Sequence, residues 1–120
     1  MSVTTLLGMP GARGLFSKAI AQSGAAHVGA DPEDARLVTR ELSAALGFDA
    51  TAASLAEVDL DKLIEAHATV RDAMAVAPDP ARYGASIVAT GMALIPVADG
   101  DVLPVHPLAA LAAGAGGWIK

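Results

Sequence analysis

A short apolar run, Lys18–Gln22, constrains the fold more than any other stretch of this sequence. It centres on Ile20, is too short for a helix, and is followed by Ser23 and Gly24, a pair typical of sharp turns. The pattern predicts a strand buried on both faces. Such strands belong to parallel sheets, whose neighbouring strands are joined through crossover helices. We therefore expect an α/β fold that is mostly helical, with one or two parallel strands.

The composition favours a helix-rich globular domain. Of the 120 residues, 53% are hydrophobic but only 3% are aromatic, and the many alanines favour helix while each buries little surface. Acids outnumber bases by 13 to 8, the net charge is −5, and the bases are scattered, so a nucleic-acid partner is not expected. Cysteine is absent, which excludes disulfides and thiolate metal sites and is compatible with a reducing cytosol.

Neither a signal peptide nor a membrane span is predicted. The start, Met1–Gly8, lacks a basic region, and its apolar run is too short for a signal peptide. Val102–Ile119 is the most apolar long stretch, but Pro104 and Pro107 interrupt it and argue against a spanning helix. The sequence therefore predicts a soluble, cytoplasmic protein with no membrane partner.

The clearest helix signal begins at Asp31. This residue suits a cap, Pro32 suits the first helical position, and the following acids favour the positive end of the helix dipole. Gly47 then ends the helix. Five residues recur at helical spacing and predict its buried face: Ala35, Val38, Leu42, Ala45 and Leu46.

Other stretches predict shorter or less regular elements. Asp59 caps a helix to Val76 that Pro78 ends, and Ala81–Met92 stays ambiguous around an apolar patch in a glycine-flanked loop. The Asp59–Val76 helix has a predicted apolar face of Leu60, Leu63, Ile64, Val70 and Met74. The remaining predicted helices are Ser2–Leu7, ended by Gly8; Thr51–Glu57, with Ser54 and Glu57 at capping-box spacing; and Pro107–Ala113, ended by Gly114.

Two β features are predicted near the end of the sequence. Ala93–Val97 and Val102–Leu103 flank Asp99-Gly100, a two-residue turn signal that predicts a hairpin. Gly117–Lys120 predicts the beginning of a further strand. Because this strand stops at once, and the helix at Ser2 has no start signal, we expect the chain to be a truncated piece of a larger fold.

Several of these motifs, in this order, resemble the type-B carboxylesterases, the cholinesterase-like family with the α/β-hydrolase fold. The matching motifs are Met1–Leu7, similar to the helix after the nucleophile elbow; Leu15-Phe16, Ala19-Ile20 and Gln22-Ser23-Gly24, similar to the next strand and its turn; and Pro96-Val97, Asp99-Gly100 and Leu103-Pro104, similar to a signature before the triad acid. The resemblance implies one incomplete α/β-hydrolase segment: residues 1–30 with the post-elbow helix, strand and turn, 31–76 as a helical insert, and 77–120 with a loop, hairpin, short helix and strand start.

The resemblance also implies which catalytic parts the chain lacks. In this fold the nucleophilic serine lies in a Gly-x-Ser-x-Gly elbow, and the acid and histidine follow in chain order. No Gly-x-Ser-x-Gly occurs in the sequence. By the resemblance, the nucleophile would precede Met1 and the other two members would follow Lys120. We therefore expect a truncated serine carboxylesterase, inactive alone, whose intact relative hydrolyses a small ester.

No residue is predicted to be catalytic, but four are assigned supporting places by the resemblance. The Ser23 hydroxyl would hold the triad acid in position, the alternative being a turn serine that satisfies local backbone groups. Ala25, Ala26 and His27 would lie on the rim of the acyl pocket, the alternative being a plain loop. The sequence does not indicate which ester is preferred.

Independent catalytic, metal or cofactor sites are not expected. The serines lack an elbow, and His27 has no acid at a readable spacing; His67 lies within a helix, and His106 is interpreted as an exposed turn residue. Gly114–Gly117 precedes a predicted strand, whereas a phosphate cradle precedes a helix. No cofactor or metal is therefore predicted.

One alternative from another class remains open. The chain would then be a small, non-catalytic helical protein that acts through self-association or a protein partner. Unpaired strands at Lys18–Gln22 and Trp118–Lys120 would favour association, because exposed strand edges recruit other chains. For a truncated esterase, the corresponding partners would be the missing portions of the enzyme.

Overall fold

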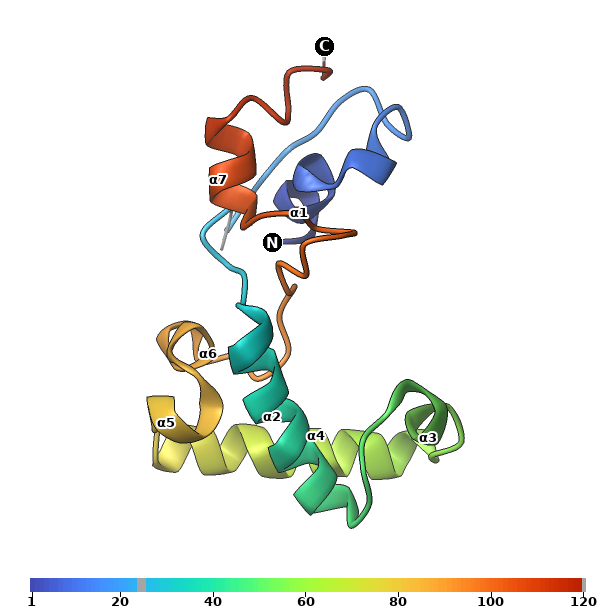
Figure 1. The fold of residues 1–120 in the computed structure, drawn as a ribbon, viewed down its shortest axis with the longest axis vertical. Coiled ribbons are helices and arrows are strands. Elements are labelled where there is room, and N and C mark those ends of the chain that lie inside the picture. The colour runs from blue at the N-terminus through green and yellow to red at the C-terminus, as the bar shows by residue number, and fades with distance from the viewer. Residues whose placement is uncertain (24–25, 120) are drawn as a thin grey trace. The chain divides into compact units, whose positions relative to one another are not determined.

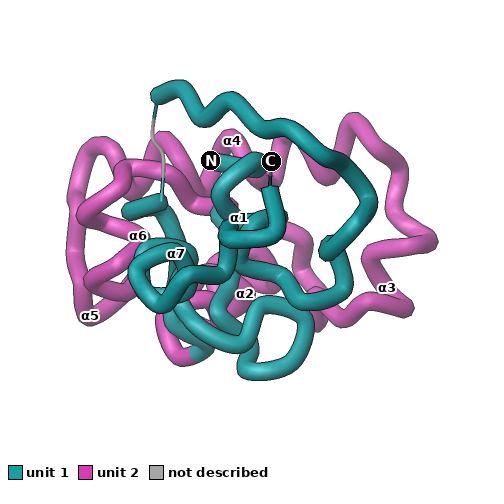
Figure 2. The backbone as a smooth tube through the Cα atoms, turned by 90° about the horizontal axis from the view of Figure 1, so that it is seen from above, with its two compact units in different colours: residues 1–32, 95–120 teal, residues 33–94 magenta. Residues whose placement is uncertain are grey.

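The computed structural model describes residues 1–23 and 26–119, and its helices there fall into two compact units (Figures 1 and 2). Unit 1 combines residues 1–32 with residues 95–120, and unit 2 comprises residues 33–94. The helices are α1 (Ser2–Gly8), the 3₁₀ helix η1 (Pro10–Ala12), α2 (Pro32–Leu46), α3 (Ala52–Ala56), α4 (Leu60–Val76), α5 (Pro80–Tyr83), α6 (Ala85–Thr90) and α7 (Pro107–Ala112). None of these described helices is long and apolar enough to cross a membrane.

Unit 1 is held together by the packing of α1 against α7. Gly8, at the end of α1, is buried at this contact. A Cβ atom on Gly8 would lie 3.3 Å from the Cβ of Ala110 and 3.4 Å from Cδ1 of Leu103. The absence of a side chain at Gly8 therefore allows the close approach of the two helices.

A short backbone pairing joins the two separate segments of unit 1. The Ala30 N–H donates to the carbonyl of Pro96 at 2.8 Å, and the Ala98 N–H donates to the carbonyl of Ala30 at 2.9 Å. Together these bonds form a parallel bridge between Ala30 and Val97. Among the described residues, this is the one place where the predicted parallel β pairing occurs.

The strand predicted at Lys18–Gln22 is absent. These residues are irregular, and the side chain of Ile20 is 79% exposed. A strand depends on hydrogen bonds to a neighbour, and the described residues supply no strand beside this segment. The strand start at Gly117–Lys120 is also wrong for Gly117–Ile119, where the Ile119 N–H donates to Gly116 in a turn; Lys120 lies outside the described residues.

The predicted hairpin around Asp99-Gly100 is absent as well. Oδ1 of Asp99 accepts the N–H of Asp101 at 3.0 Å and the N–H of Leu103 at 2.9 Å. The side chain thus takes backbone donors that would otherwise be free for a ladder, as in an Asx turn. Val97, expected to pair within the hairpin, pairs with Ala30 instead.

The two long helices of unit 2 follow their sequence signals closely. Gly47, with a φ of 81°, follows the end of α2, and Oδ1 of Asp59 caps α4 by accepting the N–H of Asp61 at 2.9 Å. The capping box of α3 pairs Thr51 with Ser54, so the predicted pair of Ser54 and Glu57 is wrong; Glu57 follows the helix at its C-cap. The ambiguous stretch Ala81–Met92 forms most of α5 together with α6.

The predicted buried faces of these helices are only partly covered. On α4, Val70 and Met74 are buried together with Ala66, whereas Leu60 is 68% and Ile64 is 56% exposed. On α2, Val38 and Leu46 are buried but Ala45 is exposed, and the prediction for Ala45 is therefore wrong. Helical periodicity identifies an apolar face, but it does not show how far along the helix that face is covered.

Asp34 of α2 caps the start of α6 from a distant part of the sequence. Its Oδ2 accepts the backbone N–H of Ser86 at 2.8 Å and the Ser86 hydroxyl at 2.6 Å. Gly84, which precedes α6, offers no side-chain cap. A Cβ atom on Gly84 would collide with the Asp34 side chain, and its φ of 91° also favours glycine. Asp34 therefore fixes α6 against α2.

Replacing Asp34 by alanine is expected to destabilise unit 2. The substitution removes both acceptor contacts to Ser86, and the free energy of unfolding should fall by about 1–3 kcal/mol. Urea unfolding followed by circular dichroism measures the change. The matched control is Glu33→Ala, because Glu33 is 86% exposed and makes only a surface pair with Arg36; its effect should stay within about 0.5 kcal/mol. Equal effects of the two substitutions would contradict the assigned role of Asp34.

Candidate functional site

Three of the residues predicted to support catalysis, Ser23, Ala26 and His27, lie in irregular parts of unit 1. The side chain of Ser23 is exposed, and its φ of 49° lies in a region that residues other than glycine seldom adopt. Ala26 is buried and His27 is exposed, while Ala25 lies outside the described residues. The proposed contact of Ser23 with a triad acid stays a prediction, and so does the assignment of Ala26 and His27 to a pocket rim.

His106 differs from its sequence interpretation as an exposed turn residue. It is half-buried, and its Nδ1 accepts the N–H of Leu108 at 3.3 Å, so that it caps α7. A Cβ atom on the buried residue Gly29 would lie 2.9 Å from the imidazole ring. His106 therefore has a structural place at the start of α7. His67 is also half-buried, within α4.

The described residues do not assemble a Ser-His-acid triad. Among the hydrogen bonds of residues 1–23 and 26–119, none joins a serine to a histidine; Ser43 bonds to backbone groups, and Ser86 donates to Asp34. In the same part of the chain, no group of three or more His, Cys, Asp or Glu side chains is placed to hold a metal ion. The Asp34–Ser86 pair was not predicted, since a contact between residues 52 positions apart leaves no local signal.

Surface hydrogen bonds explain the shifted pKa values of two side chains, Arg82 and Asp99. The side-chain hydrogen bond from Arg82 to Glu41, 2.6 Å long, raises the pKa of Arg82. The N–H groups of Leu103 and Asp101 lower the pKa of Asp99 by stabilising its carboxylate. Perturbed pKa values often mark functional sites, but here both follow from local structural contacts.

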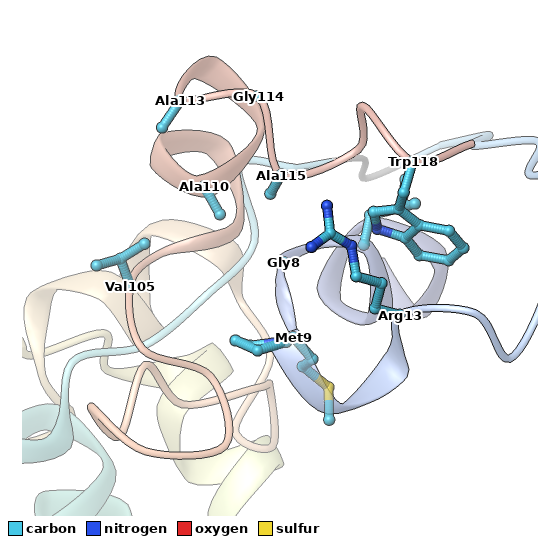
Figure 3. Close-up of a pocket in the computed structure, with 11 residues that line it drawn as sticks. Gly8, Met9, Arg13, Val105, Ala110, Ala113, Gly114, Ala115 and Trp118 are labelled. Atoms are coloured by element: carbon cyan, nitrogen blue, oxygen red, sulfur yellow. The ribbon is translucent and has the colours of Figure 1, made fainter. Parts of the chain in front are cut away.

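A pocket of about 400 Å³ lies where the end of α1 meets α7 in unit 1 (Figure 3). Arg13 is the one charged residue among those that line it, and Trp118 is the one aromatic residue. The lining residues are Leu7, Gly8, Met9, Pro10, Arg13, Val105, Ala110, Ala113, Gly114, Ala115 and Trp118. This pocket was not predicted from the sequence, because its walls come from opposite ends of the chain.

Comparison with known proteins identifies the family. The carboxylesterase family profile matches residues 1–118. Two crystal structures of carboxylesterase EST55 from Geobacillus stearothermophilus are also similar to the chain. The structure at pH 6.8 has 29% identity and a TM-score of 0.64 over 96% of the chain. The structure at pH 6.2 has 32% identity and a TM-score of 0.65 over 98% of the chain.

The chain therefore belongs to the carboxylesterase family, as its motifs predict. It spans about a fifth of the length of the EST55 chains, 21% in both comparisons. The resemblance to type-B carboxylesterases is thus confirmed, and a partial α/β-hydrolase fold agrees with the match, although the specific strands and hairpin predicted from the sequence are absent from the described residues.

The Asp99 turn is expected to weaken in acid. Because folding lowers the pKa of Asp99, its contribution to stability is present above the unfolded pKa, near 3.8, and is lost as the pH falls through the folded value. An NMR titration that follows the amides of Asp101 and Leu103 should therefore give a midpoint below 3.8.

Two variants control for this effect. Asp99→Asn should remove this transition, whereas Asp101→Asn, which removes a charge two residues away, should leave it in place because Asp101 contributes its backbone N–H and not an acceptor. A midpoint at or above 3.8 in the unmodified chain would contradict the assignment.

Proposed function

We propose that this chain is the part of a serine carboxylesterase that lies between the nucleophile elbow and the triad acid. One observation supports this most: the family profile covers residues 1–118, yet the chain matches only 21% of the length of EST55. The absence of Gly-x-Ser-x-Gly from the sequence agrees with it. The chain would then contribute scaffold and pocket walls to the enzyme. We also propose a cytoplasmic location, with which the lack of cysteine is compatible.

The whole enzyme would hydrolyse a carboxylic ester in two steps. A serine activated by histidine attacks the ester carbonyl and forms an acyl-enzyme as the alcohol leaves, and water then releases the carboxylic acid. Backbone N–H groups stabilise the oxyanion in both steps. Without these groups, residues 1–120 have no means to stabilise the tetrahedral intermediates, and the isolated chain is expected to be inactive.

Within that enzyme, Ser23 would be a positioning residue. Its exposed hydroxyl is free of the hydrophobic core, and its positive φ gives the side chain a direction that regular backbone does not offer. Unusual backbone conformations of this kind cluster at functional sites. A hydroxyl that donates to the triad carboxylate would fix the orientation of the acid, while Ala26 and His27 would lie on the rim of the acyl pocket.

A second candidate function is favoured by the exposed apolar side chains. Leu15 is 77% and Ile20 is 79% exposed, and such residues promote association with further copies or with a protein partner. In the proposed esterase, the remaining polypeptide would cover them instead. Sedimentation analysis separates the two candidates, because a discrete and cooperatively unfolding dimer would favour the non-catalytic interaction protein.

A chimera tests the proposed function directly. Residues 1–118 replace the matching segment of EST55, and hydrolysis of a short-chain p-nitrophenyl ester is measured. We expect the chimera to hydrolyse the ester and the isolated chain to give no hydrolysis above the buffer rate, because the reacting groups come from the host. Replacing the host's nucleophilic serine by alanine should abolish the activity. A chimera that folds, as judged by circular dichroism, but is inactive would speak against the proposal.

Ser23→Ala in the active chimera tests the positioning role. Loss of the hydroxyl should lower kcat by about 10- to 100-fold. It should also shift the acid limb of the pH profile of kcat/KM to higher pH, because a carboxylate that loses a hydrogen-bond donor has a higher pKa. Ser23→Thr retains a hydroxyl and should restore most of the rate. The matched control is Ser17→Ala, an exposed serine of the same segment. An unchanged pH profile in Ser23→Ala would refute the contact with the acid.

A further inference from the structure

The pocket at the end of α1 is large enough to hold a small molecule. Its volume of about 400 Å³ lies within the range of about 300–1,000 Å³ that is usual for ligand pockets. Leu7, Met9, Val105 and Ala110 give it apolar surface from both segments of unit 1. Those walls would favour an apolar group by removing it from water.

Arg13, which is exposed to solvent, is the one cation among the residues that line this pocket. Figure 3 shows the Arg13 guanidinium projecting into the space beside Ala115, with the indole of Trp118 next to it. A guanidinium presents a planar fork of N–H donors that matches both oxygens of a carboxylate. The residues that line the pocket include no acid that would neutralise Arg13, although the whole chain has a net charge of −5.

The position of Trp118 is supported by a second aromatic ring. Its ring centroid lies 4.9 Å from that of Phe16, with an interplanar angle of 60°. This edge-to-face contact is a favourable aromatic arrangement and holds the indole at the pocket wall. The pocket therefore combines a half-buried indole, packed against Phe16, with one exposed cation.

We propose that this pocket binds a small monocarboxylate with an apolar tail. The carboxylate pairs with Arg13, and the tail lies against Trp118 and the apolar residues at the α1–α7 contact. One cation among the lining residues favours one carboxylate, since a second would have no partner there. If the proposed esterase function holds, the acid released by ester hydrolysis belongs to this ligand class.

Hexanoate is a suitable probe, and the 120-residue chain provides its own reporter. Trp118 is the single tryptophan of the sequence, so the tryptophan fluorescence of the chain comes from a residue that lines the pocket. Adding hexanoate should change the Trp118 emission saturably, with a dissociation constant on the order of 1 mM. Hexan-1-ol, which has the same chain length without the charge, should bind at least about tenfold more weakly.

Arginine variants show whether the response depends on Arg13. Arg13→Gln should weaken hexanoate binding by about tenfold or more. Arg13→Lys keeps the charge but loses the planar fork of donors, so its hexanoate affinity should lie between those of the unmodified chain and Arg13→Gln. Arg71→Gln is the matched control, because Arg71 is an exposed arginine of α4 in unit 2 and should leave binding unchanged. Circular dichroism verifies that each variant retains its helices.

NMR gives an independent readout of the same binding. The backbone amides of Gly8 and Ala115 should shift with hexanoate, and that of Ala66 in unit 2 should not. Equal affinity of the unmodified chain and Arg13→Gln, or no saturable response, would overturn the proposal. Because binding is measured on this chain and hydrolysis on the chimera, the pocket proposal and the proposed function can fail separately.

Discussion

The close packing of α1 against α7 at Gly8 is the contact on which unit 1 depends. It joins two segments that are distant in the sequence, and a side chain at Gly8 would meet Ala110 and Leu103 within 3.4 Å. The pocket with Arg13 and Trp118 is formed by the same pair of segments. Unit 1 has a shallow core in which small residues such as Ala30 and Ala110 are buried. Val28 and Leu103 are buried there as well, so the close approach of the backbones at Gly8 and the packing of these side chains together set its geometry.

The helices could be predicted because residues next to each helix in the sequence determine where it begins and ends. Pro32 and Gly47 delimit α2, Asp59 begins α4, and Pro107 begins α7. The prediction of a strand at Lys18–Gln22 failed because a strand forms only if a partner lies beside it. The hairpin failed for a related reason: the side chain of Asp99 competes with the backbone for the same donors.

The same limit applies to the candidate sites: local motifs could be predicted from the sequence, but contacts between distant residues could not. The order of the motifs along the chain was sufficient to identify the carboxylesterase family, whose profile matches residues 1–118. The sequence did not indicate which distant residues come together: Asp34 contacts Ser86 in unit 2, and Arg13 and Trp118 line the same pocket of unit 1. The Ser23 assignment rests on resemblance, and the exposed side chain with its unusual φ is compatible with it.

The bridge between Ala30 and Val97 has a consequence for how this family segment can vary. Two segments that pair in parallel cannot be linked by a tight turn and need a crossover of about a dozen residues or more. Here the crossover contains all of unit 2, residues 33–94, which is a compact body in its own right. A change of length within that inserted body therefore leaves the register of the bridge unaltered, down to the shortest crossover that geometry permits.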